Sequence, residues 1–139
     1  IKKISLAALA AASIATMGLP SPAGAGGDER HEVRAELGGK SRASGKADYR
    51  DRMRRGTIEQ RFSVEVEDAK PGETLEVHVN GALFGTMTVD DLGRAELQFR
   101  TAQFIDDPGD GTPIDMDFPR LLPGDTITVG GLAGTFQLD

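Results

Sequence analysis

The sequence predicts an all-β protein: an antiparallel β-sandwich of seven to eight strands with Ig-like or Greek-key connections, after an N-terminal signal helix. Three observations lead to this fold class. From residue 32 onward, apolar and polar residues alternate with a period of two, as in strands that bury one face and expose the other. Turn-forming residues recur at roughly the 8–12-residue spacing of sandwiches and barrels. No segment after the signal has the 3.6-residue period of an amphipathic helix.

The first 25 residues have the order of a secretory signal peptide. Lys2 and Lys3 precede an apolar run, Ile4–Leu19, and Pro20 follows it. Residues 23–25, Ala-Gly-Ala, match the small residues of a cleavage site. The apolar run is shorter than the ~20 residues that a membrane-spanning helix needs. We therefore expect residues 1–25 to be removed on export.

Export would leave a periplasmic or extracellular protein with no membrane span. We expect residues 26–31 to form a flexible N-terminal segment and residues 32–139 to form a single β-sandwich domain. The sequence contains no Cys. Disulfides, thiol chemistry and a lipid-anchoring cysteine are therefore excluded, and the domain must depend on its own core.

The first three predicted strands lie at Glu32–Leu37, Lys46–Met53 and Thr57–Asp68. In each of them every second residue is apolar, which assigns one face to the core. The residues expected on that buried face are Val33, Ala35 and Leu37, then Ala47, Tyr49 and Met53, then Ile58, Phe62, Val64 and Val66.

The register of the second and third strands follows from matching like faces across a hairpin. Pairing Met53 with Ile58 places Tyr49 opposite Phe62 on the buried face. The same register sets three pairs on the exposed face. The two pairs of opposite charge are each expected to contribute only ~0.2–1 kcal/mol, whereas Arg50 faces an arginine of the same charge. These pairs are Arg52 with Glu59, Lys46 with Glu65, and Arg50 with Arg61.

The later strands are shorter, and Asn80-Gly81 is a strong hairpin signal between two of them. Phe84 falls on an exposed face. It is expected either to be covered by Phe104 or Phe118 or to mark a contact surface. The long connection, Thr101–Asp125, is of a length that is often functional. The buried-face residues expected in these strands are Leu75, Val77 and Val79; Leu83, Met87 and Val89; Ala95, Leu97 and Phe99; Ile127 and Val129; Phe136 and Leu138.

Charge is distributed unevenly along the chain. Residues 28–61 contain ten Lys/Arg and seven Asp/Glu, a net charge of +3, whereas residues 62–139 contain four and fifteen, a net charge of −11. Nucleic-acid binding requires a cationic footprint. The acidic C-terminal half argues against a nucleic-acid partner and suits a protein that meets cations.

The segment Asp106–Asp117, DDPGDGTPIDMD, contains five aspartates among Gly, Pro and Thr. On an EF-hand-type loop, Asp106, Asp110 and Asp117 take positions 1, 5 and 12, but Pro108 stands at position 3 and cannot ligate through its side chain. Two interpretations stay open: a looser calcium site and a solvated loop rich in turn residues. The candidate metal ligands are Asp106, Asp107, Asp110, Asp115 and Asp117.

A second candidate site is a cluster of arginines around the predicted second hairpin. It consists of Arg50, Arg52, Arg54, Arg55 and Arg61. Such a cluster could bind an acidic polymer such as a surface glycan, or an acidic face of a protein, including another copy of the chain. Asp48, Asp51 and Glu59 lie among these arginines, so a charge-balanced exposed face is the alternative.

No arrangement of residues indicates an enzyme. His78 is predicted on an exposed strand face without a second catalytic group nearby, and His31 lies in the expected N-terminal segment. The serines lack the sequence context of a nucleophile elbow. These residues give no catalytic site.

Several strings cover nearly all of the predicted domain: ASGKADYRDR, RFSVEVEDAKPGETLEVHVNG, GTMTVDDLGRAELQFRT and LLPGDTITVGGLAGTF. In these strings the chain resembles small exported proteins of environmental bacteria without an assigned function. The early SGKA strand and the late Gly-containing strand are also similar in layout to CHRD (chordin-type) domains. Neither resemblance implies a catalytic residue.

Together the observations lead to three functional hypotheses. The first is a non-enzymatic exported β-sandwich that acts as a binding or structural module at the cell surface or in the periplasm. The second is a calcium-dependent extracellular module that uses the Asp106–Asp117 loop. The third, a small hydrolase, has the weakest support in the sequence.

Overall fold

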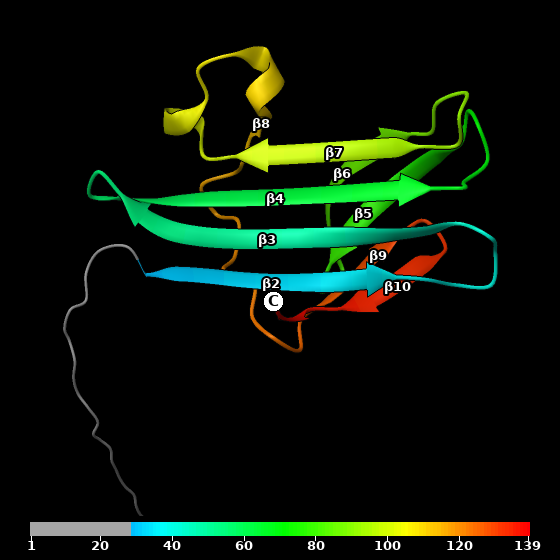
Figure 1. Ribbon diagram of the computed structural model, residues 1–139, viewed down its shortest axis with the longest axis horizontal. Helices are drawn as coiled ribbons and strands as arrows, with labels where there is room; N and C mark the ends of the chain where they lie inside the picture. Colours follow the sequence, from blue (N-terminus) through cyan, green and yellow to red (C-terminus); the bar gives the residue numbers. More distant parts are fainter. Residues whose placement is uncertain (1–28) are drawn as a thin grey trace, which may run out of the picture.

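The computed structural model describes residues 29–139, so the predicted signal peptide and residues 26–28 lie outside the described residues. Within this part of the chain, ten strands form two sheets, one of six strands and one of four. The two layers cross in Figure 1, with β5, β6, β9 and β10 behind the larger sheet. The predicted all-β sandwich is confirmed, but it has ten strands where seven to eight were predicted, because the sequence did not reveal the short strands β8 and β10.

The six-stranded sheet has the order β11-β2-β3-β4-β7-β8. All its neighbouring strands are antiparallel except β7 and β8. Its long central strands form the face seen in Figure 1. The strand bounds are β2 Arg30–Leu37, β3 Ser44–Arg54, β4 Thr57–Glu67, β7 Ala95–Arg100, β8 Thr112–Pro113 and β11 Gln137–Leu138.

The predicted hairpin register is confirmed in every pair. Met53 lies opposite Ile58 and Tyr49 opposite Phe62. Met53 and Ile58 were predicted to be buried, but both are about half exposed, because this end of the hairpin extends beyond the core. The exposed-face pairs are also as predicted: Arg52 with Glu59, Lys46 with Glu65 and Arg50 with Arg61.

The four-stranded sheet has the order β10-β9-β5-β6 and is antiparallel. Its register shifts at Val77/His78, where Leu83 pairs with His78 and Gly85 with Val77. The extra residue, Phe84, is a bulge that reverses the alternation of side chains. Leu83 was predicted to be buried and is instead 55% exposed. The strand bounds are β5 Thr74–Val79, β6 Ala82–Thr88, β9 Thr126–Val129 and β10 Leu132–Thr135.

The two chain ends differ slightly from the prediction. Strand β2 begins at Arg30, so His31 is part of the sheet, and its Nε2 lies 2.6 Å from the carbonyl oxygen of Leu121. At the other end Phe136 is buried as predicted, but Leu138 is 71% exposed on the edge strand β11. Strand β10 was not predicted, since its sequence, LAGT, shows little alternation.

The long connection between β7 and β9 covers one open end of the sandwich. It contains two short 3-10 turns, η3 (Ala102–Phe104) and η4 (Pro108–Asp110), and the short strand β8. The Phe118 ring from this connection stacks on Tyr49, is tilted against Phe62 and meets Phe84 edge to face, with the ring centroids of Phe84 and Phe118 4.8 Å apart. Covering of Phe84 by the long connection is therefore confirmed.

No helix in residues 29–139 is long and apolar enough to cross a membrane.

Candidate anion-binding surface

The outer face of the six-stranded sheet, the face turned away from the core, carries the predicted arginine cluster. The strand pairing brings its side chains into rows that run across the strands. One row contains Arg30, Arg52 and Glu59, from β2, β3 and β4. The next row contains Glu32, Arg50, Arg61 and Arg100, from β2, β3, β4 and β7.

Glu59 is the buried centre of the first row. Its side chain is only 1% exposed, and four arginines surround it. Arg100 Nη2 lies 2.8 Å from Glu59 Oε2, and Arg52 Nε lies 3.0 Å from Oε1. Arg54 Nη1 and Arg61 Nε each lie 3.4 Å from Oε2. The carboxylate thus fixes guanidinium groups that come from three different strands.

These contacts keep Glu59 ionised. Burial would raise its pKa, but hydrogen bonds from Arg100 and Arg52, together with the positive charges of Arg100 and Arg61, lower the pKa to about 2. One negative charge is therefore shared among four positive charges. The sequence predicted Glu59 to be an exposed member of a weak surface pair with Arg52, and this was wrong because arginines from three strands cover it.

The second row carries positive charge in excess. Arg50, Arg61 and Arg100 occupy paired positions on three neighbouring strands, and Glu32 is the single acid of the row. Within the described residues, Arg50 forms no ion pair shorter than 4.0 Å. Burial and the like charges of Arg100 and Arg50 lower the pKa of Arg61, although the side chain stays cationic.

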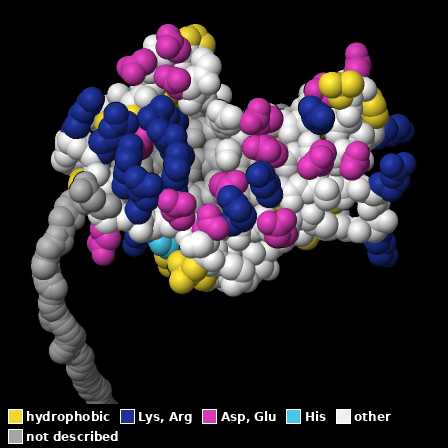
Figure 2. All heavy atoms as spheres, viewed as in Figure 1, with side chains coloured by type: hydrophobic (Ala, Val, Ile, Leu, Met, Phe, Trp, Pro, Cys, Tyr) yellow, Lys and Arg dark blue, Asp and Glu magenta, His cyan; other side chains and the backbone are white. Residues whose placement is uncertain are grey.

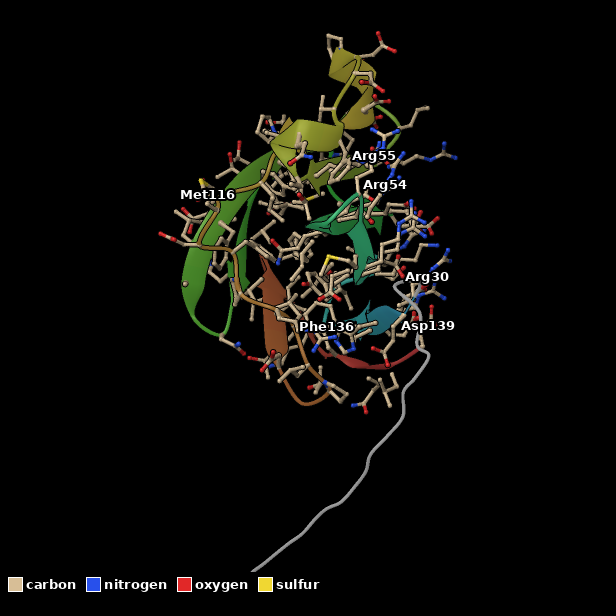
Figure 3. The ribbon with its side chains drawn as sticks, turned by 90° about the vertical axis from the view of Figure 1, so that its left-hand side faces the viewer. Arg30, Arg54, Arg55, Met116, Phe136 and Asp139 are labelled. Carbon is tan, nitrogen blue, oxygen red and sulfur yellow. The ribbon has the colours of Figure 1, made fainter. Side chains whose placement is uncertain are left out.

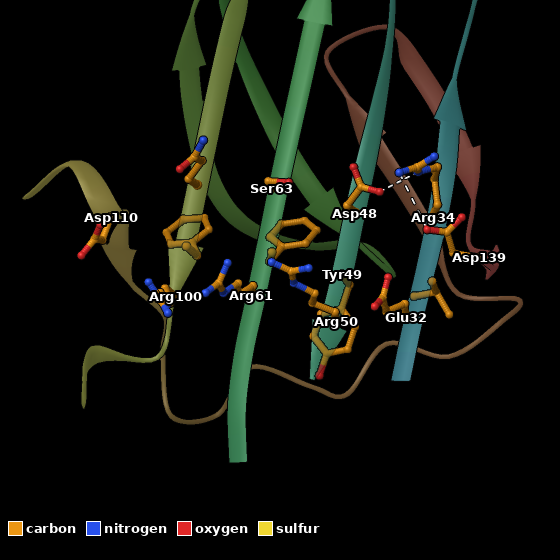
Figure 4. Close-up of a pocket in the computed structure, with 14 residues that line it drawn as sticks. Glu32, Arg34, Asp48, Tyr49, Arg50, Arg61, Ser63, Arg100, Asp110 and Asp139 are labelled. Atoms are coloured by element: carbon orange, nitrogen blue, oxygen red, sulfur yellow. Dashed lines mark hydrogen bonds and ion pairs between the residues drawn. The ribbon is translucent and has the colours of Figure 1, made fainter. Parts of the chain in front are cut away.

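A hollow of about 320 Å³ lies beside this row. In Figure 4, Arg100, Arg61 and Arg50 line one side of it, and the short side chain of Ser63 lies in its floor. The opposite side holds Arg34, whose Nε donates to Asp48 Oδ1 over 2.6 Å. Polar floor and wall groups of this kind can bind the hydroxyl groups of a ligand, while the arginines bind its anionic groups.

Charged side chains are unevenly distributed along the strands on the outer face. Figure 2 shows a dense group of Lys and Arg side chains at one end of this face, Asp and Glu side chains over its middle and far part, and further Lys and Arg side chains in the middle and at the far edge. A row toward the other end contains Glu36, Lys46, Glu65 and Glu96. An anion would therefore be attracted to the arginine end and repelled from the other.

The structure brings together most of the predicted arginine cluster. Arg50, Arg52, Arg54 and Arg61 project from the outer face, whereas Arg55 occupies the β3–β4 turn with a φ of 52°. Arg54 also lies 4.9 Å from the ring centroid of Phe104. In Figure 3, Arg54 and Arg55 lie on the side of the molecule opposite Met116.

Arg100 belongs to the surface but was not part of the predicted cluster. The alternation of β7 placed it on an exposed face, yet nothing in the sequence pairs β7 with β4. The β5–β6 hairpin separates the two strands along the chain and belongs to the other sheet. The pairing of Arg61 with Arg100 can therefore be recognised only when the order of the strands in the sheet is known.

The Asp106–Asp117 loop is arranged largely by turns. Asp110 Oδ2 accepts hydrogen bonds from the backbone N–H groups of Asp106 and Asp107, both over 3.1 Å. These bonds lower the pKa of Asp110 and stabilise η4. Asp115 and Asp117 are exposed, and in residues 29–139 no group of three or more His, Asp or Glu side chains is placed to hold a metal ion. The calcium site stays a prediction.

A polar network that the sequence did not reveal lies beneath the long connection. Asp51 is 8% exposed and accepts hydrogen bonds from Tyr49 Oη (2.8 Å) and Arg120 Nε (2.9 Å). Gln60 Nε2 donates to Tyr49 Oη and to the carbonyl oxygen of Phe118. The network ties the connection to β3 and β4, so it serves the fold rather than a surface site.

Comparison with known proteins adds no relative. No family model matches the chain, and no curated protein matches it at a significant level. The resemblance to exported bacterial proteins and to CHRD domains therefore stays a prediction.

Proposed function

We propose that this protein is a non-enzymatic exported β-sandwich that acts as a binding module at the cell surface or in the periplasm, and that its ligand is an acidic surface glycan. One observation carries the proposal: Arg50, Arg61 and Arg100 stand side by side on three paired strands, in a row that contains one acid, Glu32.

Repulsion between the arginines of the cluster destabilises the free protein and favours the binding of an anion. Like charges directly opposite one another destabilise a sheet, so an anion that lies between them removes repulsion. Glu59 fixes the neighbouring guanidinium groups, and the strands beneath are rigid, so less conformational entropy is lost on binding. Arginine also binds carboxylate and sulfate groups in a bidentate manner.

The test is binding of the purified protein to polygalacturonate, followed by titration calorimetry. We expect binding that weakens as salt is added, because the contacts are between exposed charges. Replacing both Arg50 and Arg61 with Gln should reduce the affinity at least about tenfold, a loss of about 1.4 kcal/mol. The Arg42→Gln variant removes a charge from an exposed loop outside the cluster and should bind nearly as the unchanged protein does.

Two outcomes would contradict the proposal. One is the absence of binding to polygalacturonate and to other acidic polysaccharides at low salt. The other is an equal loss of affinity in the Arg42 variant and in the double variant. A separate assay tests the proposal that the protein is not an enzyme. After incubation with the protein, the polysaccharide should keep its size. The appearance of new reducing ends would indicate a hydrolase.

A calcium-dependent module remains the alternative proposal. It is supported by five aspartates within residues 106–117 and by the low pKa of Asp110. Both backbone hydrogen bonds use Oδ2 of Asp110, so Oδ1 can meet a cation without breaking them. Millimolar calcium, the range of weak extracellular sites, should then raise the Tm relative to EDTA, and Asp110→Asn should abolish the rise. An unchanged Tm would count against this alternative.

A further inference from the structure

Exposed apolar side chains of this molecule differ in the charges that surround them. Seven large ones are exposed within residues 29–139. Three of these have an aspartate beside them in the sequence: Leu92, Met116 and Leu138. Met53 and Ile58 are different, because they face each other across β3 and β4 and the residues on both sides of Met53 are arginines. They are 46% and 56% exposed and form an apolar pair.

The apolar pair lies at the end of the β3–β4 hairpin, outside the part of the sandwich that the long connection covers. The preceding row on the same face of the sheet is Asp51 with Gln60. Asp51 accepts a hydrogen bond from Arg120, and Gln60 donates one to the carbonyl oxygen of Phe118. The apolar pair is the next row outward, at the left end of the sheet in Figure 1. It therefore protrudes from the molecule rather than lining a groove.

The other side of the hairpin end carries positive charge. Residues 50–61 contain five arginines and two acids, a net charge of +3. One of these acids, Asp51, is bonded to Arg120, which lies outside this segment. The other, Glu59, is shared among four arginines. Arg55 occupies the turn and is exposed. The hairpin end is therefore amphipathic, with the apolar pair on one face and arginines on the other face and in the turn.

We infer that the end of the β3–β4 hairpin docks on a bilayer surface that contains anionic phospholipids. The apolar pair enters the boundary between headgroups and acyl chains, as the apolar side chains of interfacial protein segments do. The arginines bind the lipid phosphate groups, which a guanidinium group can contact through two hydrogen bonds. The contact is peripheral, and it goes beyond the proposed function because it involves no glycan.

Both halves of the hairpin end have a partner in such a bilayer. A glycan chain would meet the arginines but would offer no apolar phase to the apolar pair. A protein partner would need a hydrophobic groove shaped to receive a protruding pair, whereas the headgroup boundary adapts to a shallow projection. At the opposite end of the sandwich in Figure 1, the turn between β6 and β7 exposes Leu92 beside Asp90 and Asp91. An anionic bilayer repels that turn, so the two ends are not equivalent.

The backbone of the hairpin end can enter this boundary at low cost. The turn has two residues, Arg55 and Gly56, with φ values of 52° and 75°, as in the type I′ turns of tight hairpins. Arg54 and Thr57 close it as the last pair of the two strands. Because strand pairing satisfies backbone polar groups up to the turn, little unpaired backbone loses water on docking.

The first experiment measures co-sedimentation with vesicles of phosphatidylglycerol and phosphatidylcholine in equal parts, and with vesicles of phosphatidylcholine alone. The protein is taken after export and its N-terminus is determined by mass spectrometry, since the apolar run Ile4–Leu19 would itself bind lipid. The partition coefficient should be at least about tenfold higher for the anionic vesicles. Absence of binding to the anionic vesicles, or equal binding to both kinds, would overturn the inference.

Matched variants assign the binding to the hairpin end. Replacing both Met53 and Ile58 with Gln keeps every charge and should lower the partition coefficient for anionic vesicles at least about tenfold. Leu92→Gln removes a more exposed apolar side chain from the opposite end and should change the coefficient by less than about twofold. Arg55→Gln should lower it about three- to fivefold, and Arg42→Gln by less than about twofold. Equal losses in the hairpin variants and their controls would contradict docking through the hairpin.

A fluorescent label reports whether the hairpin end enters the bilayer. The chain has no Cys, so the variants Ile58→Cys and Leu92→Cys each accept a single environment-sensitive dye. Emission from the label at position 58 should shift to the blue when anionic vesicles are added, while emission from position 92 should not. Binding without a shift at position 58 would mean that the arginines attract the bilayer without entry of the apolar pair, and the inference would fail.

Failure of this inference and failure of the proposed function are distinguishable. Polygalacturonate should bind the Met53/Ile58 double variant as it binds the unchanged protein, because the arginine row is intact in that variant. If anionic vesicles bind and polygalacturonate does not, the proposed function fails and the inference holds. The reverse result has the opposite meaning. Thermal unfolding of each variant confirms that the compared proteins are folded.

Discussion

Glu59 is a carboxylate buried under arginines on the outer face of a sheet, a position where solvent-exposed side chains are expected. Alternation placed it on that face, and the register placed it opposite Arg52. Its burial depends on Arg54, Arg61 and Arg100 as well. Glu59 therefore holds the arginine surface in place, and its protonation state matters for stability.

The low pKa of Glu59 predicts a loss of stability in acid. The ordinary pKa is 4.5 and the folded value is about 2, so folding favours the ionised form. Its contribution is complete above about pH 4.5 and is lost as the pH falls toward 2. Allowing for solvent around the arginines, the loss is on the order of 1–3 kcal/mol. Urea unfolding measured across this pH range checks the predicted loss of stability. The Glu59→Gln variant should lack the part of the pH dependence that comes from Glu59.

Removal of the Glu59 charge should also destabilise the protein at neutral pH. In Glu59→Gln, four arginines keep their positive charges without the buried counter-charge. We expect the free energy of unfolding to fall by about 2–4 kcal/mol. Glu65→Gln, on the same strand and face but exposed, is the control and should change it by less than about 0.5 kcal/mol. Similar effects in the two variants would contradict the central position of Glu59.

At the scale of the elements, strand β4 tests the assignment of faces. Val64 is fully buried and Glu65, its neighbour, is exposed. Val64→Asp places an unpaired charge in the core and should leave the domain unfolded at room temperature. Glu65→Lys should be nearly silent. Circular dichroism distinguishes the two, and a folded Val64→Asp variant would refute the assignment of the inner face.

The long connection should contribute stability mainly through Phe118. This side chain is buried against Tyr49, Phe62 and Phe84, so Phe118→Ala should lower the free energy of unfolding by about 3–5 kcal/mol. Met116, two residues earlier, is 99% exposed, and Met116→Ala should change it by less than about 0.5 kcal/mol. Equal denaturation midpoints for the two variants would show that the connection does not pack on the sandwich.

The elements that the sequence predicted best are those with local signals. The β3–β4 hairpin was predicted to the exact register because both strands alternate and a short turn joins them. Leu83 was misplaced because a bulge at Phe84 reverses the alternation; Gly85, the next residue in the strand, was the sequence signal that could have indicated it. Asp51 was not recognised as buried, since its partner Arg120 lies 69 residues away in the sequence.

At the scale of the whole molecule, function depends on pairings between distant strands. The sequence predicted a cluster of five arginines around the β3–β4 hairpin, and four of them project from the outer face, since β3 and β4 are adjacent in the chain. It could not predict Arg100 beside Arg61, because β7 joins the sheet only after the chain has formed β5 and β6 in the other layer. The sequence could not predict the hollow beside the row for the same reason, because its lining residues Ser63 and Gln98 lie on the paired strands β4 and β7.

If the proposed binding of a polyanion holds, the uneven charge of the outer face should orient the molecule toward its ligand. The arginine end attracts it, and Glu36, Glu65 and Glu96 at the far end repel it. This arrangement explains how a protein with a net charge of −6 can present a local anion-binding surface. Contacts should therefore be restricted to one end of one face.

The most direct test is an NMR titration of the isotopically labelled protein with oligogalacturonate, which observes backbone amides and arginine Nε–H groups. The account predicts saturable shifts in the Nε–H groups of Arg50, Arg61 and Arg100 and in the amides around Ser63, with Arg42 and Arg94 unchanged. Shifts centred on residues 106–117 or on the acidic end, or the absence of shifts in the arginine row, would contradict it.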